Sequence, residues 1–326
     1  MAHLLEVKNL VTEFRTDRAT VRAVDGVSYY IDEGEVVGLV GESGCGKSAS
    51  QLSVFQLIAS PPGKIVSGEA LFEGEDILKY KADSEKMREI RGGKMGMIFQ
   101  EPMTSLNPSL TIGTQIMESV MLHLKMDKRT ARELALELLR LMGIPDAIER
   151  FYQYPHQFSG GMRQRVMIAI ALSCNPKLLV ADEPTTALDV TTQAQILEIV
   201  KNMVKKSNTA LLVVTHNLGV VARYADRIYV MYAGRVIESG KSKDIFAAPR
   251  HPYTVGLLKS VPRLDEPKGR KLVPIPGLPP SLSSMPGHCA FYPRCSYRVD
   301  ACKQKPWPEL RNVGDDHYTA CALDMR

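Results

Sequence analysis

The sequence predicts an α/β fold with a largely parallel sheet, and three observations support this expectation. Short β-rich apolar runs alternate with helical patterns along most of the chain, which is typical of strands joined by crossover helices. A glycine-rich loop separates the apolar run Val36–Val40 from a helical pattern that begins at about Lys47. Hydrophobic residues make up 44% of the 326 residues and charged residues 24%, so a buried core is expected.

Four further apolar runs are expected to be buried strands, because each is short, rich in β-branched or bulky residues and bounded by polar or turn residues. They are Met95–Phe99, Leu178–Ala181, Leu211–Thr215 and Ile228–Tyr232. A helical pattern covers Thr191–Lys205. Residues 101–175 interrupt the alternation, since they lack strand signals and contain helical stretches such as RTARELALELLRLMG. We therefore expect a helical subdomain at about 101–175 within a main domain at 1–260.

The composition changes beyond residue 260. Seven prolines fall within residues 262–286, which predicts an extended segment with little regular structure. Four of the six cysteines follow this segment. Residues 261–326 are therefore predicted to be a proline-rich linker and a small cysteine-rich, metal-binding extension.

Charge and hydropathy restrict the classes of partner. The formal net charge of +5 is small and no Lys/Arg run resembles a nucleic-acid tract, so no nucleic-acid partner is expected. The N-terminus lacks a signal-peptide pattern, and the most apolar runs span only five to seven residues, too few to cross a bilayer. We expect a cytoplasmic chain, in which clustered cysteines indicate metal or redox chemistry.

The glycine-rich loop GESGCGKS matches the phosphate-binding motif G-x-x-x-x-G-K-[ST]. Glycines let backbone N–H groups surround a phosphate, and the following helix N-terminus adds partial positive charge. Lys47 is expected to reach the β- and γ-phosphates, and Ser48 to ligate Mg²⁺. A simple glycine-rich turn is the alternative, which the flanking strand and helix disfavour. The candidate phosphate-binding residues are Gly41, Ser43, Gly44, Cys45, Gly46, Lys47, Ser48 and Ala49.

A second motif, KLLVADEP, ends an apolar strand in two carboxylates. We expect Asp182 to hold Mg²⁺ through water and Glu183 to act as the general base that polarises the attacking water. Alone, such a strand would more often simply meet a turn, but together with the loop at Lys47 the catalytic interpretation is favoured.

The stretch FSGGMRQR lies between these two motifs. With it the chain resembles the ATP-binding cassette (ABC) family, whose signature reads LSGGQ followed by a basic stretch. Phe158 replaces Leu and Met162 replaces Gln, but the Ser-Gly-Gly core is kept and can form a second anion site at a helix N-terminus. In the family this core meets the γ-phosphate bound by the opposite subunit. The residues concerned are Ser159, Gly160 and Gly161.

The other elements of the family appear in order. Gln100 matches the Q-loop glutamine, which senses Mg²⁺ and the attacking water. Asp189 matches the D-loop, and His216 matches the switch histidine that contacts the γ-phosphate. Asn217 stands where the family usually has Asp. Phe14 falls where the family places an aromatic that stacks on adenine, and simple core packing is the open alternative for this residue.

The resemblance spans residues 4–260 and implies a P-loop ABC ATPase domain, with a RecA-like core, an antiparallel β subdomain and a helical subdomain. It implies ATP and Mg²⁺ at the site. The chain has one P-loop and one signature, whereas each site in the family combines the P-loop of one subunit with the signature of another. Hydrolysis is therefore expected only when the chain is paired.

Two segments, FQEPMTSLNPSLTIG and APRHPYTVGLLKSVP, make the chain similar to oligopeptide/dipeptide importer ATPases, most of all to the dipeptide-permease type. The implied partners are a second, different ATPase, two membrane permeases and an extracytoplasmic peptide-binding protein. The chain would then work at the cytoplasmic face of the membrane, with a permease coupling helix near residues 103–108. An ATPase of a nickel or other small-solute importer and a soluble, non-transport ABC ATPase are the alternatives.

The cysteines lie in a proline-rich segment that is expected to be poor in strands and has few apolar residues. A bound metal could hold such a segment together. Zinc sites typically contain short C-x₂₋₄-C knuckles, which are absent here, whereas wider spacing suits a larger cluster. The resembled dipeptide-permease ATPases are associated with a four-cysteine [4Fe–4S] tail. We therefore expect a structural [4Fe–4S] cluster, with zinc or unligated cysteines as alternatives and His288 and His317 as further possible ligands. The candidate ligands are Cys289, Cys295, Cys302 and Cys321.

Overall fold

The computed structural model describes residues 2–184, 190–260, 273–304, 306–323 and 325. The chain folds as two units. Unit 1 comprises residues 1–31, 36–78 and 213–326, and unit 2 comprises residues 32–35 and 79–212. None of the helices in the described ranges is both long enough and apolar enough to span a bilayer.

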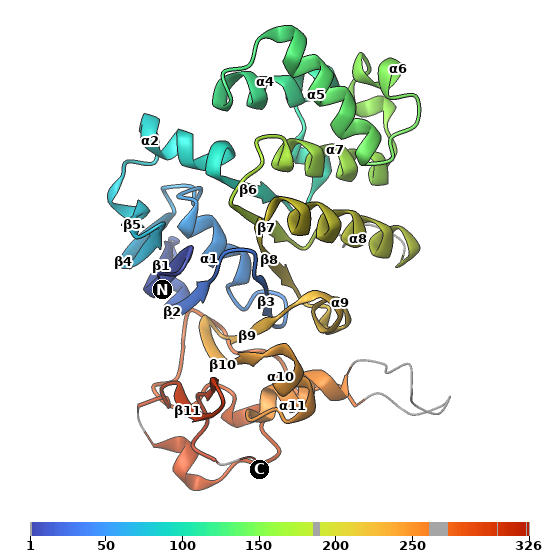
Figure 1. Ribbon diagram of the computed structural model, residues 1–326. Coiled ribbons are helices and arrows are strands. Elements are labelled where there is room, and N and C mark those ends of the chain that lie inside the picture. The colour runs from blue at the N-terminus through green and yellow to red at the C-terminus, as the bar shows by residue number, and fades with distance from the viewer. Residues whose placement is uncertain (1, 185–189, 261–272, 305, 324, 326) are drawn as a thin grey trace. The chain divides into compact units, whose positions relative to one another are not determined.

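Unit 1 contains an antiparallel sheet formed largely by the N-terminal part of the chain (Figure 1). In β1, Leu5 pairs with Ile31 on one side and with Phe72 on the other, and all three side chains are buried. This apolar face packs against the helix that follows the glycine-rich loop. The elements are β1 (Leu5–Arg15), β2 (Thr20–Ile31), β4 (Gly63–Phe72), β5 (Glu75–Asp76) and helix α1 (Lys47–Val54).

A second set of strands in unit 1 carries the loop. Strand β3 (Val36–Val40) runs parallel to β9 (Arg227–Tyr232), and β9 pairs antiparallel with β10 (Arg235–Lys241). All of β9 except its first residue is buried, as expected for a strand covered on both faces. The β9–β10 turn uses two residues with positive φ, Ala233 and Gly234, which suits the twist of a tight hairpin. Helices α9 (Leu218–Tyr224), α10 (Ser242–Ala247) and α11 (Pro252–Lys259) complete this part.

Unit 2 combines two parallel strands, β6 (Met95–Ile98) and β7 (Leu178–Asp182), with helices. No strand occurs in residues 99–177, where α4 and α5 begin at side-chain caps. Thr111 accepts a hydrogen bond from the Thr114 backbone, and Asp127 accepts from two backbone N–H groups. The helices are α2 (Glu85–Arg88), α3 (Pro102–Ser105), α4 (Ile112–His123), α5 (Lys128–Leu141), α6 (Ala147–Phe151), α7 (Gly160–Leu172) and α8 (Val190–Ser207). Strand β8 (Ala210–Thr215) leads from unit 2 into unit 1.

The five strands predicted from the sequence are confirmed to within one residue, and the helix predicted at 191–205 is α8. The same patterns did not locate β1, β2 and β4. Their lengths of 11, 12 and 10 residues exceed that of the usual strand, and register shifts within β1 interrupt its alternation of buried and exposed side chains.

The C-terminal extension is more regular than its composition predicts. It contains the 3₁₀ helices η4 (Tyr292–Arg294) and η5 (Asp300–Lys303), followed by β11 (Arg311–Gly314) and β12 (His317–Thr319). Strand β12 pairs antiparallel with β10, and β11 pairs with β12. The expectation of a strand-poor tail is therefore wrong for residues 311–319, because the exposed edge of β10 gives even a three-residue strand a template for pairing.

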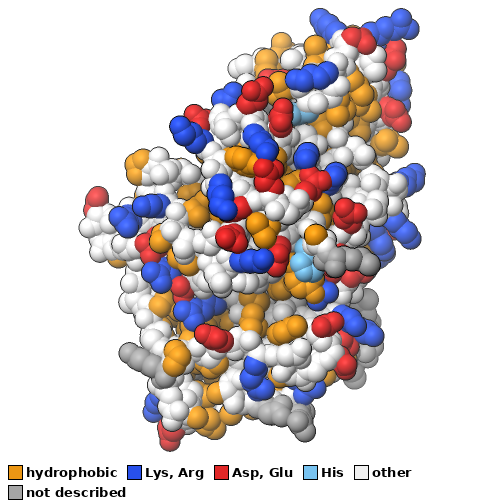
Figure 2. Space-filling model, turned by 60° about the vertical axis from the view of Figure 1, so that its left-hand side comes forward, with side chains coloured by type: hydrophobic (Ala, Val, Ile, Leu, Met, Phe, Trp, Pro, Cys, Tyr) orange, Lys and Arg blue, Asp and Glu red, His pale blue; other side chains and the backbone are white. Residues whose placement is uncertain are grey.

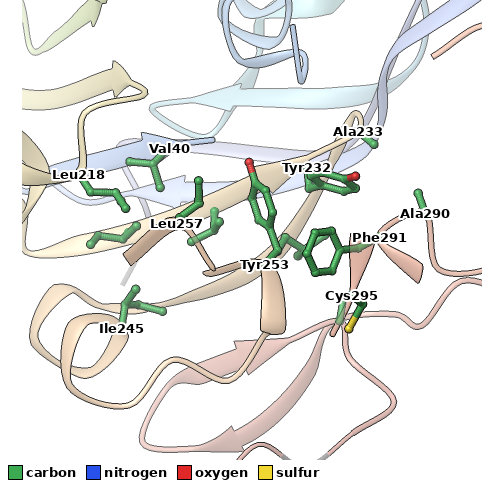
Figure 3. Packing of buried hydrophobic residues seen from close by; sticks show 14 of the residues in the cluster. Val40, Leu218, Tyr232, Ala233, Ile245, Tyr253, Leu257, Ala290, Phe291 and Cys295 are labelled. Atoms are coloured by element: carbon green, nitrogen blue, oxygen red, sulfur yellow. The ribbon is translucent and has the colours of Figure 1, made fainter. Parts of the chain in front are cut away.

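Apolar packing joins the extension to the rest of unit 1. Tyr232, Tyr253 and Phe291 come from β9, α11 and the extension, and their ring centroids lie 4.6 to 5.5 Å apart. Figure 3 shows these rings clustered at tilted and edge-on angles, with Cys295 near Phe291. Aromatic pairs at such separations stabilise a core beyond simple burial. The extension therefore shares one hydrophobic core with the strands that carry the loop.

Candidate active site

The glycine-rich loop joins β3 to α1 in unit 1. The Lys47 ammonium lies at its centre and donates hydrogen bonds to the backbone oxygens of Gly41, at 2.8 Å, and Glu42, at 2.9 Å. The Lys47 side chain is buried, so its charge is held among loop carbonyls rather than in solvent. This arrangement presents the cation and the first turn of α1 to the same place, as a phosphate site requires.

Two glycines of the loop have no room for a side chain. A Cβ atom on Gly46 would lie 2.0 Å from the Ala23 carbonyl oxygen, and one on Gly41 would lie 2.2 Å from the Met231 carbonyl oxygen. Gly46 also has a φ of 102°, which L-residues rarely adopt. The glycines of the motif therefore let the loop approach the neighbouring backbone of β2 and β9.

Cys45 is buried within the loop, and its sulfur lies 3.8 Å from the Lys47 nitrogen. Burial raises the pKa of the Cys45 thiol, and the Lys47 charge opposes this shift without reversing it. The residue is therefore a protonated, packed thiol. Cys174, in unit 2, is likewise buried, and burial raises the pKa of its thiol.

The carboxylates of the second motif lie at the end of β7 in unit 2. Asp182 and Glu183 are both buried, with 5% and 8% of their surface exposed. Glu183 adopts a left-handed φ of 46°, a conformation that costs an L-residue about 1–2 kcal/mol and often marks a functional site. Gln100 donates a hydrogen bond from Nε2 to Oε2 of Glu183, at 3.1 Å. Because β6 and β7 are parallel neighbours, their carboxyl ends bring these residues together.

The signature residues lie at the start of α7 in unit 2. Ser159 is the N-cap of this helix, and its Oγ accepts a hydrogen bond from the Met162 backbone N–H at 3.3 Å. Ser159 and Gly160 are exposed, Gly161 is half-buried, and a Cβ atom on Gly160 would contact nothing within 4 Å. The segment therefore offers an open helix N-terminus to a ligand from outside.

The remaining candidates are placed less specifically. His216 is exposed after β8. Asn217 caps α9, because its side chain accepts a hydrogen bond from the Gly219 backbone N–H at 3.0 Å. Asn217 therefore acts as a helix cap although the family usually has Asp at this position. Phe14 is half-buried in β1, between Val21 of β2 and Gly63 of β4. That position is compatible with sheet packing and with stacking on a base. Asp189 lies outside the described residues.

The four cysteines of the extension line one small pocket, together with apolar side chains such as Phe291. Burial and the neighbouring cysteines raise the pKa of Cys321 to about 11, and burial also raises the pKa values of Cys289 and Cys295. Within the described part of the chain, no three His, Cys, Asp or Glu side chains are arranged to hold a metal ion. The cysteine-lined pocket is therefore a gathering of thiols without the close geometry of a single-ion site.

Other residues near the cysteines have different partners. His317 is buried with its Nε2 2.7 Å from Oε1 of Glu238 on β10, so its ring fastens β12 to the sheet. The His288 ring packs edge-on to Tyr292. Trp307 packs in the hydrophobic core with Arg235 over its ring at 4.8 Å.

Sequence reasoning missed a contact between the extension and the phosphate-binding loop. Arg294 forms two hydrogen bonds to the carboxylate of Glu42, at 2.7 and 2.8 Å. The two residues are 252 positions apart, and no spacing or periodicity signals such a pair.

Comparison with known proteins supports these motifs as a set. The model of the ABC transporter family matches residues 24–186, and the model of the oligopeptide/dipeptide transporter C-terminal region matches residues 237–302. The oligopeptide transport ATP-binding protein OppD of Bacillus subtilis (strain 168) is 50% identical, over 98% of this chain and 88% of its own length. The dipeptide transport ATP-binding protein DppD of the same strain is also 50% identical, over 99% of this chain and 95% of its own length.

A solved structure agrees with the fold. The dimeric, post-hydrolysis state of an ATP-binding cassette bound to ADP and Pi has a TM-score of 0.65 and 29% identity, over 73% of this chain and 98% of that chain. Phosphate loop, paired carboxylates and helix-capping signature thus occur in a chain related along nearly its whole length to peptide-transport ATP-binding proteins. The chain belongs to the ABC transporter family, as an ATP-hydrolysing subunit of the oligopeptide/dipeptide importer type.

Proposed function

We propose that this chain hydrolyses ATP to power the import of di- or oligopeptides through a membrane transporter. The observation that carries the proposal is the match of residues 237–302 to the oligopeptide/dipeptide transporter C-terminal region, because a cassette domain alone is compatible with many cargoes. The alternative within the same subfamily is an ATPase for nickel or another small solute.

The proposed chemistry assigns each side chain a role at the Mg²⁺–ATP substrate. Lys47 would neutralise the β- and γ-phosphates, and Ser48 would ligate Mg²⁺ with support from Asp182. Glu183 would accept a proton from the attacking water, since its carboxylate is buried and its Oε2 is already oriented by Gln100. A base held in one orientation spends less free energy on reaching the reactive geometry.

We propose that His216 completes this set by contacting the γ-phosphate, as in the resembled family. Its exposed position directly after β8 supports this role, since the carboxyl ends of strands are where α/β proteins bind ligands. For Phe14 the proposal is stacking on adenine, and for Asp189 a D-loop role.

The site is proposed to be completed by a second, different ATPase subunit. The support is the open N-terminus of α7, where Ser159 and Gly160 are exposed. A helix N-terminus of this kind binds anions through backbone N–H groups. These residues would bind the nucleotide that is held by the P-loop of the partner subunit. The nucleotide at the P-loop of this chain would in turn contact the signature residues of the partner subunit.

Two membrane permeases and an extracytoplasmic peptide-binding protein are the further proposed partners, and the chain would dock at the cytoplasmic face of the membrane. Helices α4 to α6 of unit 2 support permease docking, because they surround a groove. Met117, Met121 and Leu122 line it on α4, and Tyr152 lines it after α6. In Figure 2, apolar side chains gather among charged ones in the upper part of the molecule, which these helices form. Adaptable methionine surfaces suit contacts with a partner helix, which would also reach residues 103–108.

For the cysteines we propose a [4Fe–4S] cluster, with zinc as the alternative. The donor set fits: four thiols line one largely apolar pocket, and the pKa of Cys321 is raised by burial and by the neighbouring thiolates. A cationic cluster core would remove that repulsion. The wide spacing of the four cysteines, without a short C-x₂₋₄-C knuckle, favours the larger cluster over zinc. When bound, the group would supply a covalent staple for the extension.

The experiment for the transport function uses the assembled complex in liposomes. Di- and oligopeptides delivered by the binding protein should stimulate ATP hydrolysis, whereas Ni²⁺ should not. Stimulation by Ni²⁺ alone would instead favour the small-solute alternative. ATP hydrolysis by the chain without permeases, unaffected by any solute, would favour a non-transport ATPase.

A further inference from the structure

The phosphate-binding loop is in direct contact with the C-terminal extension. The Arg294 guanidinium binds the Glu42 carboxylate with both Nη atoms, at 2.7 and 2.8 Å. Only 4% of the Arg294 side chain is exposed, against 27% for Glu42. A two-pronged arginine–carboxylate pair of this kind is among the stronger and more directional contacts in proteins.

Glu42 is the second residue of the loop, and it is held on three sides. Its backbone N–H donates to the Tyr253 hydroxyl at 2.8 Å, and its backbone oxygen accepts from Lys47 at 2.9 Å. Its side chain is held by Arg294. Two of these three contacts come from α11 and the extension, so residues far along the chain fix where the loop begins.

Arg294 is itself rigidly placed. Its Nε donates to the Pro276 carbonyl at 3.0 Å, and its Nη1 lies 3.5 Å from the Tyr232 hydroxyl. Arg294 is the last residue of η4, and the residue that precedes this helix is Phe291, whose ring packs on Tyr253 (Figure 3). A guanidinium held by a backbone carbonyl and an aromatic core needs no reordering to hold its partner.

The pair also matters electrostatically. The loop is shaped to receive a triphosphate, which carries several negative charges, yet it contains a carboxylate next to Gly41. Two like charges within a few ångströms repel strongly when solvent is partly excluded. Arg294 offsets the charge of the partly exposed Glu42 carboxylate, which leaves the Lys47 ammonium as the uncompensated charge of the loop.

We propose that Arg294 is a positioning residue for ATP binding: its paired hydrogen bonds to Glu42 fix the start of the phosphate-binding loop and neutralise a carboxylate that would otherwise repel the nucleotide. The inference rests on the proposed function only in taking Mg²⁺–ATP as the ligand. It makes the extension part of the nucleotide site.

The test measures Mg²⁺–ATP affinity of the full-length chain by calorimetry, and KM and kcat for ATP in the assembled complex. Arg294→Gln should raise Kd and KM by on the order of tenfold, with a smaller change in kcat, because the loss falls on binding rather than on the general base. Glu42→Gln in the Arg294→Gln background should recover most of the loss, since no unpaired carboxylate then faces the phosphates.

Arg298→Gln is the matched control, because Arg298 lies in the same extension and contacts the Pro293 carbonyl and Tyr292 rather than the loop. Its Kd should stay within about twofold of wild type, as for other surface changes. If Arg294→Gln does not fold, Arg294→Lys replaces it and should raise Kd by roughly threefold, because Lys keeps the charge but not the paired geometry.

Unchanged ATP affinity in the folded Arg294 variant would overturn the proposal. So would an equal loss in Arg298→Gln, or a double variant no better than Arg294→Gln alone, since these outcomes indicate general damage to the extension. The affinity ratios do not depend on cargo. A wild-type chain that binds ATP normally but lacks peptide-stimulated hydrolysis would refute the transport function and leave the Arg294 inference intact.

Discussion

The phosphate-binding loop and the cysteine-lined pocket belong to the same unit but are assembled in opposite ways. The loop consists of consecutive residues, Gly41–Ser48, between one strand and one helix. The pocket collects cysteines from positions 289 to 321: Cys289 and Cys295 precede η5, Cys302 lies within it, and Cys321 follows the β11–β12 hairpin. Local backbone geometry defines the first site, whereas the second exists only when the extension is folded onto the sheet. The contact between Arg294 and Glu42 shows that the local site also depends on the distributed region.

The largest effect is expected from a change in the proposed general base of the ATP site. Glu183→Gln should lower ATP turnover by about 10²–10⁴-fold, because it removes the proposed general base. Mg²⁺–ATP binding should remain, since the phosphates are held by Lys47 and the loop. Steady-state hydrolysis in the complex and calorimetric binding measure the two effects. Unimpaired turnover would show that another group takes the proton.

Next in size is the steric requirement of the loop itself. Gly46→Ala should abolish measurable ATP binding, because its Cβ would lie 2.0 Å from the Ala23 carbonyl oxygen. Gly44→Ala is the matched control: it also has a positive φ, but its Cβ would meet nothing within 4 Å, so only about 1–2 kcal/mol of backbone strain is expected. A larger loss of affinity in Gly44→Ala would mean that contact with the ligand, and not packing on β2, limits this loop.

The cysteine-lined pocket is tested by measuring the metal content of the protein. In protein purified without oxygen, we expect about four irons and four sulfides per chain, and Cys321→Ser should lose most of both and unfold at a lower temperature. Cys174→Ser, which removes a buried thiol outside the pocket, should keep the full content. One zinc per wild-type chain and no iron would replace the cluster by the zinc alternative, and no bound metal would refute both.

The smallest effect concerns how the extension is fastened to the sheet. The Glu238 side chain is fully buried and accepts hydrogen bonds from His317, at 2.7 Å, and from the His251 backbone, at 2.9 Å. Glu238→Gln should destabilise unit 1 by about 1–3 kcal/mol, because a carboxylate oxygen is replaced by a donor facing a donor. Denaturant unfolding followed by fluorescence measures this, with the exposed Glu309→Gln as a control. Equal midpoints for the two variants would mean that β12 is held by other contacts.

Much of the site was predictable because its parts follow local rules. The loop is predicted from closely spaced glycines between a strand and a helix, and Gln100 meets Glu183 because parallel neighbouring strands end at one edge. Arg294 and Glu42 are brought together by packing between distant segments, for which no local pattern exists. Strand β12 has only three residues, too few for an alternation of buried and exposed positions to identify it. Its formation is decided by the edge of β10.

The ion pair between the loop and the extension also has an evolutionary consequence. An ABC ATPase that lost its extension would keep an acidic residue at position 42 without its counter-charge. An ABC ATPase that gained an extension, but had no acidic residue at position 42, would have an arginine beside the loop without a partner. Substitutions at positions 42 and 294 should therefore occur together among related chains. If Arg294 positions the loop as proposed, hybrid proteins joined near residue 260 should bind ATP normally only when they carry the matching residue at position 42.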